Sequence, residues 1–132
     1  MILVDTNVLL DVFEDDPDWS DWSQHQLDSA CATDSLAINA VIYSELSIGF
    51  ARIEELEAVI EEASLAIETI PREALFLAGK AYLRYRRNSG TKRSVLPDFY
   101  IGAHAAVMQW PLLTRDVGRY RVYFPTVSLI AP

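Results

Sequence analysis

The chain has 132 residues, of which 51% are hydrophobic and 23% charged, and its net charge is −8. This length suits one domain over residues 1–132, and the composition excludes a disordered chain. No apolar run approaches the roughly 20 residues that cross a bilayer, no signal peptide is visible, and the single cysteine, Cys31, excludes an intrachain disulfide, so we expect a cytoplasmic protein.

Short apolar runs alternate with segments of helical periodicity. In the first half of the chain we expect a strand at residues 1–5, helices over 7–14 and 19–32, a strand at 36–38, and helices over 40–50 and 52–63. In the second half we expect a strand at 65–69, a helix over 71–88, a loop at 89–94, a helix over 97–109, a strand at 111–114 and a last strand within 122–130. The alternation predicts an α/β fold, a three-layer α/β/α sandwich with a parallel central sheet of about five strands. In such sheets, functional sites lie beyond the carboxyl ends of the strands.

Asp5 stands at the carboxyl end of the first predicted strand. An aspartate at this point either caps the helix that follows or performs chemistry, and its position alone favours neither role. Asn7 could share the capping, which would leave Asp5 free to point into a cleft.

Glu45 lies on the apolar stripe of its predicted helix, at helical spacing from Val41 and Ile42. A carboxylate on an inward face is costly unless it is paired or binds a metal. Pairing with an arginine, or a helix-end position that reaches solvent, stays open as an alternative to metal binding.

Asp98 follows Pro97 in the first turn of a predicted helix, where the helix dipole favours a negative charge for structural reasons. Asp116 follows the fourth predicted strand and is a plausible helix cap. Neither residue is decisive alone. The four acids together are more informative, because two unit charges 4 Å apart repel by about 4 kcal/mol at a dielectric near 20, and a divalent cation offsets that repulsion.

The ligand types in this set narrow the choice of metal. Carboxylate oxygens favour Mg²⁺ or Mn²⁺ over zinc. The two histidines, His25 and His104, have no ligand partner at the spacing of a metal site and are better explained as surface or core residues.

Four short segments resemble, in order, the motifs of the PIN-domain family, and more narrowly the VapC-type ribonuclease toxins of toxin–antitoxin pairs. The segments are residues 4–10 (VDTNVLL), 44–46 (SEL), 97–105 (PDFYIGAHA) and 113–116 (LTRD). The resemblance implies a metal-dependent endoribonuclease that hydrolyses RNA phosphodiesters with a water activated by Mg²⁺ or Mn²⁺. It also implies a homodimer held inactive by a cognate antitoxin protein.

Matched position by position, the resemblance assigns roles to individual residues. The metal-ligand positions fall on Asp5, Glu45 and Asp98, and the fourth acidic position of the catalytic set falls on Asp116. Asn7 and Thr114 match polar positions beside the site.

The sequence departs from the family's pattern at residues 117–121 (VGRYR), which contain no acid, whereas many relatives carry a further acid there. It leaves open whether one or two metal ions bind. A non-catalytic PIN-like binding or regulatory module stays as the alternative function. A phosphatase or a phospho-acceptor receiver is disfavoured, since Asn7 stands where such a phosphatase has its second aspartate.

The charges divide unevenly along the chain. Residues 1–62 hold 15 acids and one base, and residues 63–132 hold four acids and ten bases. We expect the RNA substrate to contact the basic half, although solvated surface charges explain the same pattern equally well. The candidate phosphate-binding residues are Arg86, Arg87, Lys92, Arg93 and Arg115.

Trp19 and Trp22 lie one helical turn apart in an acidic segment. They are either core residues on a helix face or part of an aromatic, acidic groove for an antitoxin helix that carries basic residues.

Overall fold

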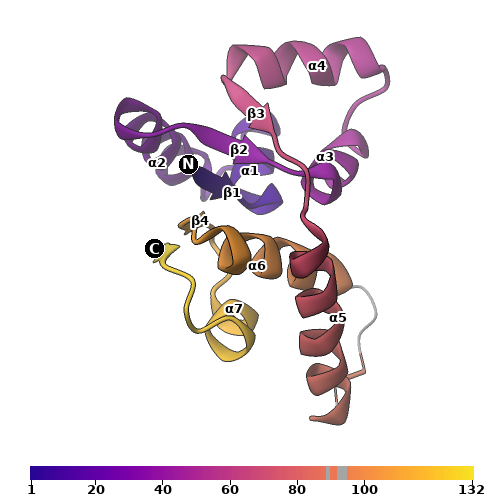
Figure 1. Cartoon of the computed structure of the whole chain (residues 1–132). Helices are drawn as coiled ribbons and strands as arrows, with labels where there is room; N and C mark the ends of the chain where they lie inside the picture. Colours follow the sequence, from indigo (N-terminus) through magenta and orange to yellow (C-terminus); the bar gives the residue numbers. More distant parts are fainter. Residues whose placement is uncertain (89, 92–94) are drawn as a thin grey trace.

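The computed structural model describes residues 1–88, 90–91 and 95–132 of the chain. Figure 1 shows the course of the chain, with the N-terminal half above the C-terminal half in this view. Its elements are β1 (Ile2–Val4), α1 (Thr6–Phe13), α2 (Ser20–Thr33), β2 (Leu36–Ile38), α3 (Ala40–Ser47), α4 (Ile53–Glu62), β3 (Leu65–Ile67), α5 (Arg72–Arg87), α6 (Leu96–Met108), β4 (Leu112–Leu113), α7 (Gly118–Tyr123) and β5 (Leu129–Ile130).

The five strands form one sheet in the order β3-β2-β1-β4-β5, and every neighbouring pair is parallel. The predicted fold class, a parallel sheet of about five strands flanked by helices, is therefore confirmed. β1 lies at the centre, with β2 on one side and β4 on the other. The chain crosses first to one side of β1 and later to the other, and such a switch point opens a crevice at the carboxyl ends of the two strands.

The three central strands read as continuous apolar runs because helices cover both of their faces. All residues of β1, β2 and β4 are buried, and Leu3, Val4, Ile38, Leu112 and Leu113 have no exposed surface. The edge strands are more open, since Ile67 of β3 is exposed and β5 is half-buried. The best-packed part of the sheet therefore lies directly beneath the carboxyl ends of β1 and β4.

Below the sheet, an aromatic cluster joins α5, α6 and α7. The Phe99 ring centroid lies 5.3 Å from that of Tyr123, 5.6 Å from that of Tyr82 and 6.0 Å from that of Phe124. Gly102 of α6 makes room for this cluster, because a Cβ atom at Gly102 would stand 2.4 Å from a carbon of the Phe124 ring. The cluster fixes α7 against α6.

Helix α7 was not expected from the sequence, whereas the last strand lies within the predicted range. Val122 and Tyr123, assigned to the strand range, end a helix instead, and β5 begins only at Leu129. Tyr120 and Phe124 are both buried and stand four residues apart, so one helical turn places both rings on the core side. Within the described part of the chain, no helix is long and apolar enough to span a bilayer.

Candidate active site

Asp5 and Thr114 lie side by side where the two central strands end. Val4 of β1 is the register partner of Leu113 in β4, and the Asp5 backbone N–H donates to the Leu113 carbonyl at 2.9 Å. The residues that directly follow these two strands, Asp5 and Thr114, therefore lie next to each other at the switch point. The Thr114 hydroxyl donates to Asp5 Oδ2 at 2.8 Å.

Asp5 is a buried carboxylate that is held from several directions. Its Oδ1 accepts the Thr6 backbone N–H at 2.8 Å and so caps α1, while its Oδ2 accepts the hydroxyls of Thr114 at 2.8 Å and Tyr120 at 2.9 Å. The pKa of Asp5 is raised to about 6, mainly because burial leaves 4% of the residue exposed. The hydrogen bonds to its oxygens lower the pKa, and the nearby Asp98 carboxylate raises it. Asp5 thus serves both as the helix cap and as part of the site.

Asn7 does not share the capping, contrary to the expectation from the sequence. Its amide nitrogen lies 3.4 Å from both Asp5 Oδ2 and Thr114 Oγ1, and its Oδ1 accepts the Arg115 backbone N–H at 3.2 Å. Asn7 therefore ties the start of α1 to the segment that leaves β4.

Glu45 reaches the same rim from α3. It is half-buried, and the Thr6 hydroxyl donates to its Oε1 at 2.7 Å. Burial raises the pKa of Glu45, and the Asp98 carboxylate raises it further. No arginine pairs with Glu45 in the described residues, so the alternative of an arginine pair is not what the structure contains.

The direction of α3 is fixed by a buried cap. Asn39 Oδ1 accepts the Ile42 backbone N–H at 3.0 Å, and the Asn39 amide nitrogen lies 3.1 Å from His104 Nδ1. Because the Asn39 amide nitrogen can only donate, His104 Nδ1 accepts and the ring proton lies on Nε2. Burial lowers the pKa of His104 and keeps the imidazole neutral. His104 is a core residue, as expected, and it holds the cap of the helix that carries Glu45.

Asp98 and Asp116 complete the acidic rim. Asp98 lies in the first turn of α6 and accepts two hydrogen bonds from Arg119 on a single oxygen, from Nε at 3.2 Å and Nη2 at 3.1 Å. Burial raises the pKa of Asp98, Arg119 lowers it, and the Asp116 carboxylate raises it. Asp116 is exposed, and its Oδ1 accepts the Gly118 backbone N–H at 3.3 Å.

Asp98 thus interacts electrostatically with each of the other three acids predicted from the sequence. The charge of Asp98 influences the pKa of both Asp5 and Glu45, and the charge of Asp116 influences that of Asp98. Their oxygen atoms are of the type that Mg²⁺ and Mn²⁺ prefer. As the side chains stand, however, no three acidic, histidine or cysteine residues of the described segments are arranged to hold a metal ion. The carboxylate oxygens are suited to a hard cation such as Mg²⁺. In this structure, however, Asp98 accepts hydrogen bonds from Arg119.

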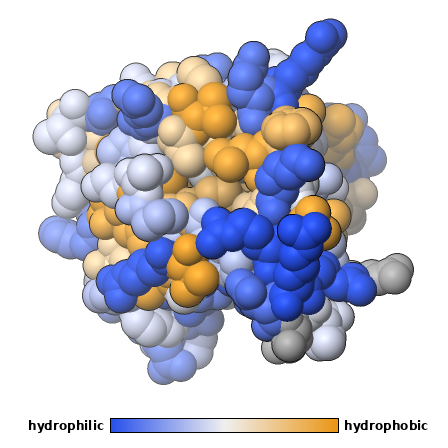
Figure 2. All heavy atoms as spheres, turned by 60° about the horizontal axis from the view of Figure 1, so that its bottom comes forward, coloured by the Kyte–Doolittle hydropathy of each residue, from blue (hydrophilic) through white to orange (hydrophobic). Residues whose placement is uncertain are grey.

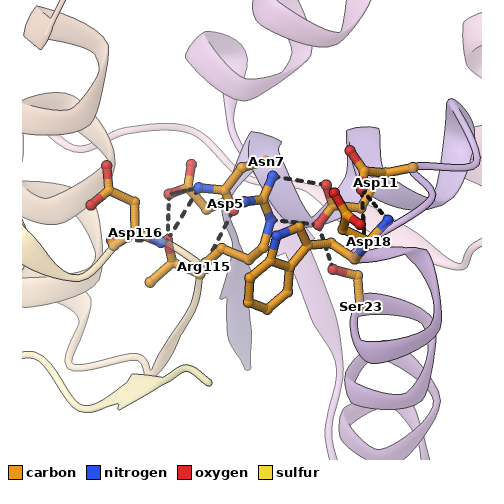
Figure 3. A network of polar contacts seen from close by, with 10 residues as sticks. Asp5, Asn7, Asp11, Asp18, Ser23, Arg115 and Asp116 are labelled. Atoms are coloured by element: carbon orange, nitrogen blue, oxygen red, sulfur yellow. Dashed lines mark hydrogen bonds and ion pairs between the residues drawn. The ribbon is translucent and has the colours of Figure 1, made fainter.

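Arg115 points away from the four acids. Its guanidinium donates to both oxygens of buried Asp11, at 2.7 and 2.9 Å, and lies over the Trp19 ring at 5.0 Å from the ring centroid. Figure 3 shows this network, in which Arg115 connects the Asn7 side of the site to Asp11 and onward to Ser23. The charge of Arg115 is already balanced, and its predicted contact with RNA stays untested.

The two tryptophans pack on each other at the start of α2. The Trp19 and Trp22 rings meet edge to face with centroids 5.9 Å apart, and both side chains are half-buried. Trp22 also packs against the core. The pair is therefore neither fully core nor freely exposed, and its role in binding a partner stays a prediction.

The basic candidates before α6 are only partly described. Arg86 and Arg87 are exposed at the carboxyl end of α5, whereas Lys92 and Arg93 lie outside the described residues. Figure 2 brings forward the end of the molecule where α5 and α7 lie in Figure 1, and hydrophilic side chains separate the apolar patches on this face. An exposed basic helix end is consistent with phosphate contacts and equally with a solvated surface.

Three contributors to the site could not be singled out from the sequence. Thr6 orients Glu45, Tyr120 donates to Asp5, and Arg119 pairs with Asp98. Tyr120 and Arg119 both depend on α7, which sequence periodicity did not predict. The spacing of Tyr120 and Phe124 was the signal that could have revealed this helix.

Comparison with known proteins places the fold. A family model described as the PIN domain matches residues 2–125. VapBC2 from Rickettsia felis bound to a promoter DNA fragment matches with a TM-score of 0.76 at 19% identity, over 100% of this chain and 99% of the other. A toxin–antitoxin complex from Klebsiella pneumoniae (TM-score 0.71, 21% identity, 96% and 95% of the two chains) and FitAcB from Neisseria gonorrhoeae (0.69, 20%, 98% and 96%) have the same fold. No curated protein matches the sequence.

Proposed function

Because the chain belongs to the PIN-domain family, we propose that it is a Mg²⁺- or Mn²⁺-dependent endoribonuclease that serves as the toxin of a toxin–antitoxin pair in the cytoplasm. The observation that carries the proposal is the electrostatic interaction of Asp98 with Asp5, Glu45 and Asp116 near the carboxyl ends of the central strands. Four carboxylates at one rim are unfavourable without a cation, and their oxygens suit a hard divalent ion.

In this proposal Asp5, Glu45 and Asp98 hold the cation. When bound, the cation lowers the pKa of a water molecule and withdraws charge from the phosphate. The protein's own part is to fix the ligands: the Thr6 hydroxyl orients Glu45, and the Thr114 and Tyr120 hydroxyls hold Asp5.

Asp116 has a different role, because it is exposed at the rim rather than held by side-chain donors. We assign to Asp116 the role of orienting the attacking water, from which its carboxylate would accept a hydrogen bond.

The test of this proposal is RNA cleavage by the purified protein on a mixed pool of structured and single-stranded RNAs. We expect cleavage with Mg²⁺ or Mn²⁺, none with EDTA, and loss of cleavage in Asp98→Asn with the fold retained. Asp28→Asn, which removes an exposed carboxylate from α2, is the matched control and should cleave like the unmodified chain. Failure of the unmodified chain to cleave any RNA with either metal would favour the non-catalytic binding module.

RNA binding is assigned to the basic end of α5. Each phosphate contact on a single strand contributes roughly 0.7 to the slope of log affinity against log salt. Replacing Arg86 and Arg87 together by Gln should therefore reduce that slope by about 1.4. Arg72→Gln at the opposite end of the same helix should leave it unchanged. An unaltered slope in the double variant would remove these arginines from the binding surface.

The proposed homodimer is supported by an apolar face of α5. Phe76 and Leu83 stand seven residues apart on one side of this helix, and 69% of Phe76 and 41% of Leu83 are exposed. Phe76→Glu should convert a dimer into a monomer in light scattering after size-exclusion chromatography. A Phe76→Glu protein that remains dimeric would place the interface elsewhere.

The proposed antitoxin has a suitable surface on the acidic half of the chain, and the matched structure from Klebsiella pneumoniae is a toxin–antitoxin complex. A groove of about 390 Å³ runs between α1, α2 and α4, and its apolar lining includes Phe13, Leu27 and Val59. Asp28 and Glu62 also line the groove, which suits an amphipathic segment with basic residues.

Two variants separate this groove from the tryptophan pair as the antitoxin surface. The affinity of each variant for the cognate antitoxin is measured by calorimetry. Leu27→Lys should weaken antitoxin binding if the groove is used, and Trp22→Ala should do so if the tryptophan pair is used. Unchanged affinity in both folded variants would exclude both surfaces.

A further inference from the structure

Arg119 is a cation at the acidic rim. Its Nε and Nη2 both donate to Asp98 Oδ2, at 3.2 and 3.1 Å. Elsewhere in residues 1–88, 90–91 and 95–132, no basic side chain forms an ion pair with Asp5, Glu45, Asp98 or Asp116. One guanidinium therefore balances part of a charge that four carboxylates create.

The ion pair engages one of the two carboxylate oxygens of Asp98. Asp98 is the central acid, since its charge acts on both Asp5 and Glu45. With two N–H donors on Asp98 Oδ2, the approach to that oxygen is taken by Arg119. A guanidinium and a divalent cation repel each other, so a cation binds Asp98 more weakly while Arg119 holds Oδ2.

We propose that Arg119 is a built-in counter-ion that holds Asp98 in the metal-free protein and competes with the divalent cation for it. This inference rests on the proposed function, because it concerns the same metal site. It predicts that the protein binds divalent cations more weakly than its acidic residues alone would.

The helix that carries Arg119 is fixed, whereas the side chain has room to leave. Tyr120 anchors α7 through its hydrogen bond to Asp5, and Phe124 anchors it in the aromatic cluster. About a third of Arg119 is exposed, with 31% of its side chain accessible, and its stem is long and flexible. Arg119 can therefore leave Asp98 by side-chain rotation while the backbone of α7 stays in place.

The test is calorimetric titration of the metal-free protein with Mn²⁺. The matched pair of variants is Arg119→Gln and Arg121→Gln, which remove the same charge from the same helix, and Arg121 is exposed without an ion pair to any described acid. A half-exposed ion pair contributes up to about 1 kcal/mol, which is roughly a fivefold change in affinity. We expect Arg119→Gln to bind Mn²⁺ about fivefold more tightly than Arg121→Gln, and Arg121→Gln to stay within about twofold of the unmodified chain.

The outcomes separate the inference from the function on which it rests. If the unmodified chain binds Mn²⁺ and Arg119→Gln binds it equally or more weakly, the competition is refuted and the metal site stands. If no form binds Mn²⁺, the proposed metal dependence is itself refuted. Binding by Arg119→Gln alone would be the strongest support for the competition.

A second measurement uses the unmodified chain and does not depend on the folding of a variant. In protein labelled with ¹⁵N-arginine, the Arg119 Nε–H signal should move as Mg²⁺ is added, because the guanidinium loses its carboxylate partner. The Arg121 signal serves as the internal reference and should stay in place. An Arg119 signal that does not move while Mg²⁺ binds would overturn the inference.

Discussion

Replacing Asp5 by Asn should stabilise the metal-free protein at neutral pH. The pKa of Asp5 is raised from 3.8 to about 6, mainly by burial, so the native state binds this proton more tightly than the unfolded chain does. At 1.36 kcal/mol per pKa unit, ionised Asp5 lowers the free energy of unfolding by about 3 kcal/mol above pH 7. Asn removes the charge and still caps the helix. Its NH₂ group, however, must lie beside the Thr114 and Tyr120 hydroxyls, which now donate to the carboxylate. We therefore expect a net increase of about 1–2 kcal/mol in the free energy of unfolding.

The sign of the pH dependence follows from the raised pKa. The penalty for ionised Asp5 is complete above about pH 6 and is lost as the pH falls toward the unfolded value of 3.8. The stability advantage of Asp5→Asn should therefore be largest at pH 7–8 and should disappear near pH 4.

Urea unfolding, followed by tryptophan fluorescence in EDTA between pH 4 and 8, measures this difference. Glu57→Gln, which removes an exposed carboxylate from α4, is the control and should change the free energy of unfolding by less than about 0.5 kcal/mol at pH 7.5. The reasoning is refuted if Asp5→Asn is less stable than the unmodified chain at pH 7.5, or if their difference is constant across the pH range.

Four further substitutions, of which Gly79→Ala is a control, test the packing around the site. Gly102→Ala should destabilise the protein by about 1–3 kcal/mol in urea unfolding because the added methyl group meets the Phe124 ring, whereas Gly79→Ala, where no atom lies within 4 Å, should stabilise it by about 0.5–1 kcal/mol; the reverse order would contradict the packing. Asn39→Ala should cost about 1–2 kcal/mol in unfolding free energy through loss of a buried helix cap, and a loss within error of zero would argue against that cap. Tyr120→Phe removes the hydroxyl that donates to Asp5, so the pKa of Asp5 should rise further, as NMR titration of that carboxyl would show. A lower pKa would contradict the hydrogen bond.

The sequence predicted the sheet and its acids because both are encoded locally. The apolar run Ile2–Val4 followed by Asp5 marks a buried strand and its carboxyl end, and parallel strands bring such ends to one edge. Asp98 could be placed because a proline and an acid mark the first turn of a helix.

The partners of those acids could not be predicted, because they depend on tertiary contacts. Arg119 reads as one more base in a basic segment, and only the packing of Tyr120 and Phe124 turns that segment into a helix facing Asp98. In the same way, Thr6 reads as the first residue of a helix, and only the folded chain brings its hydroxyl to Glu45, 39 residues away.

The placement of β1 between β2 and β4 has a consequence for synthesis on the ribosome. Residues Ile2–Val4 leave the ribosome before the other strands of the sheet, yet one side of this strand has no partner until Leu112–Leu113 has also emerged. Asp5 gains the Thr114 and Tyr120 hydroxyls at the same late moment. A nascent chain therefore carries Asp5, Glu45 and Asp98 before it carries the strand that brings Thr114 beside Asp5, and the acidic rim can form only after β4 and Asp116 have emerged.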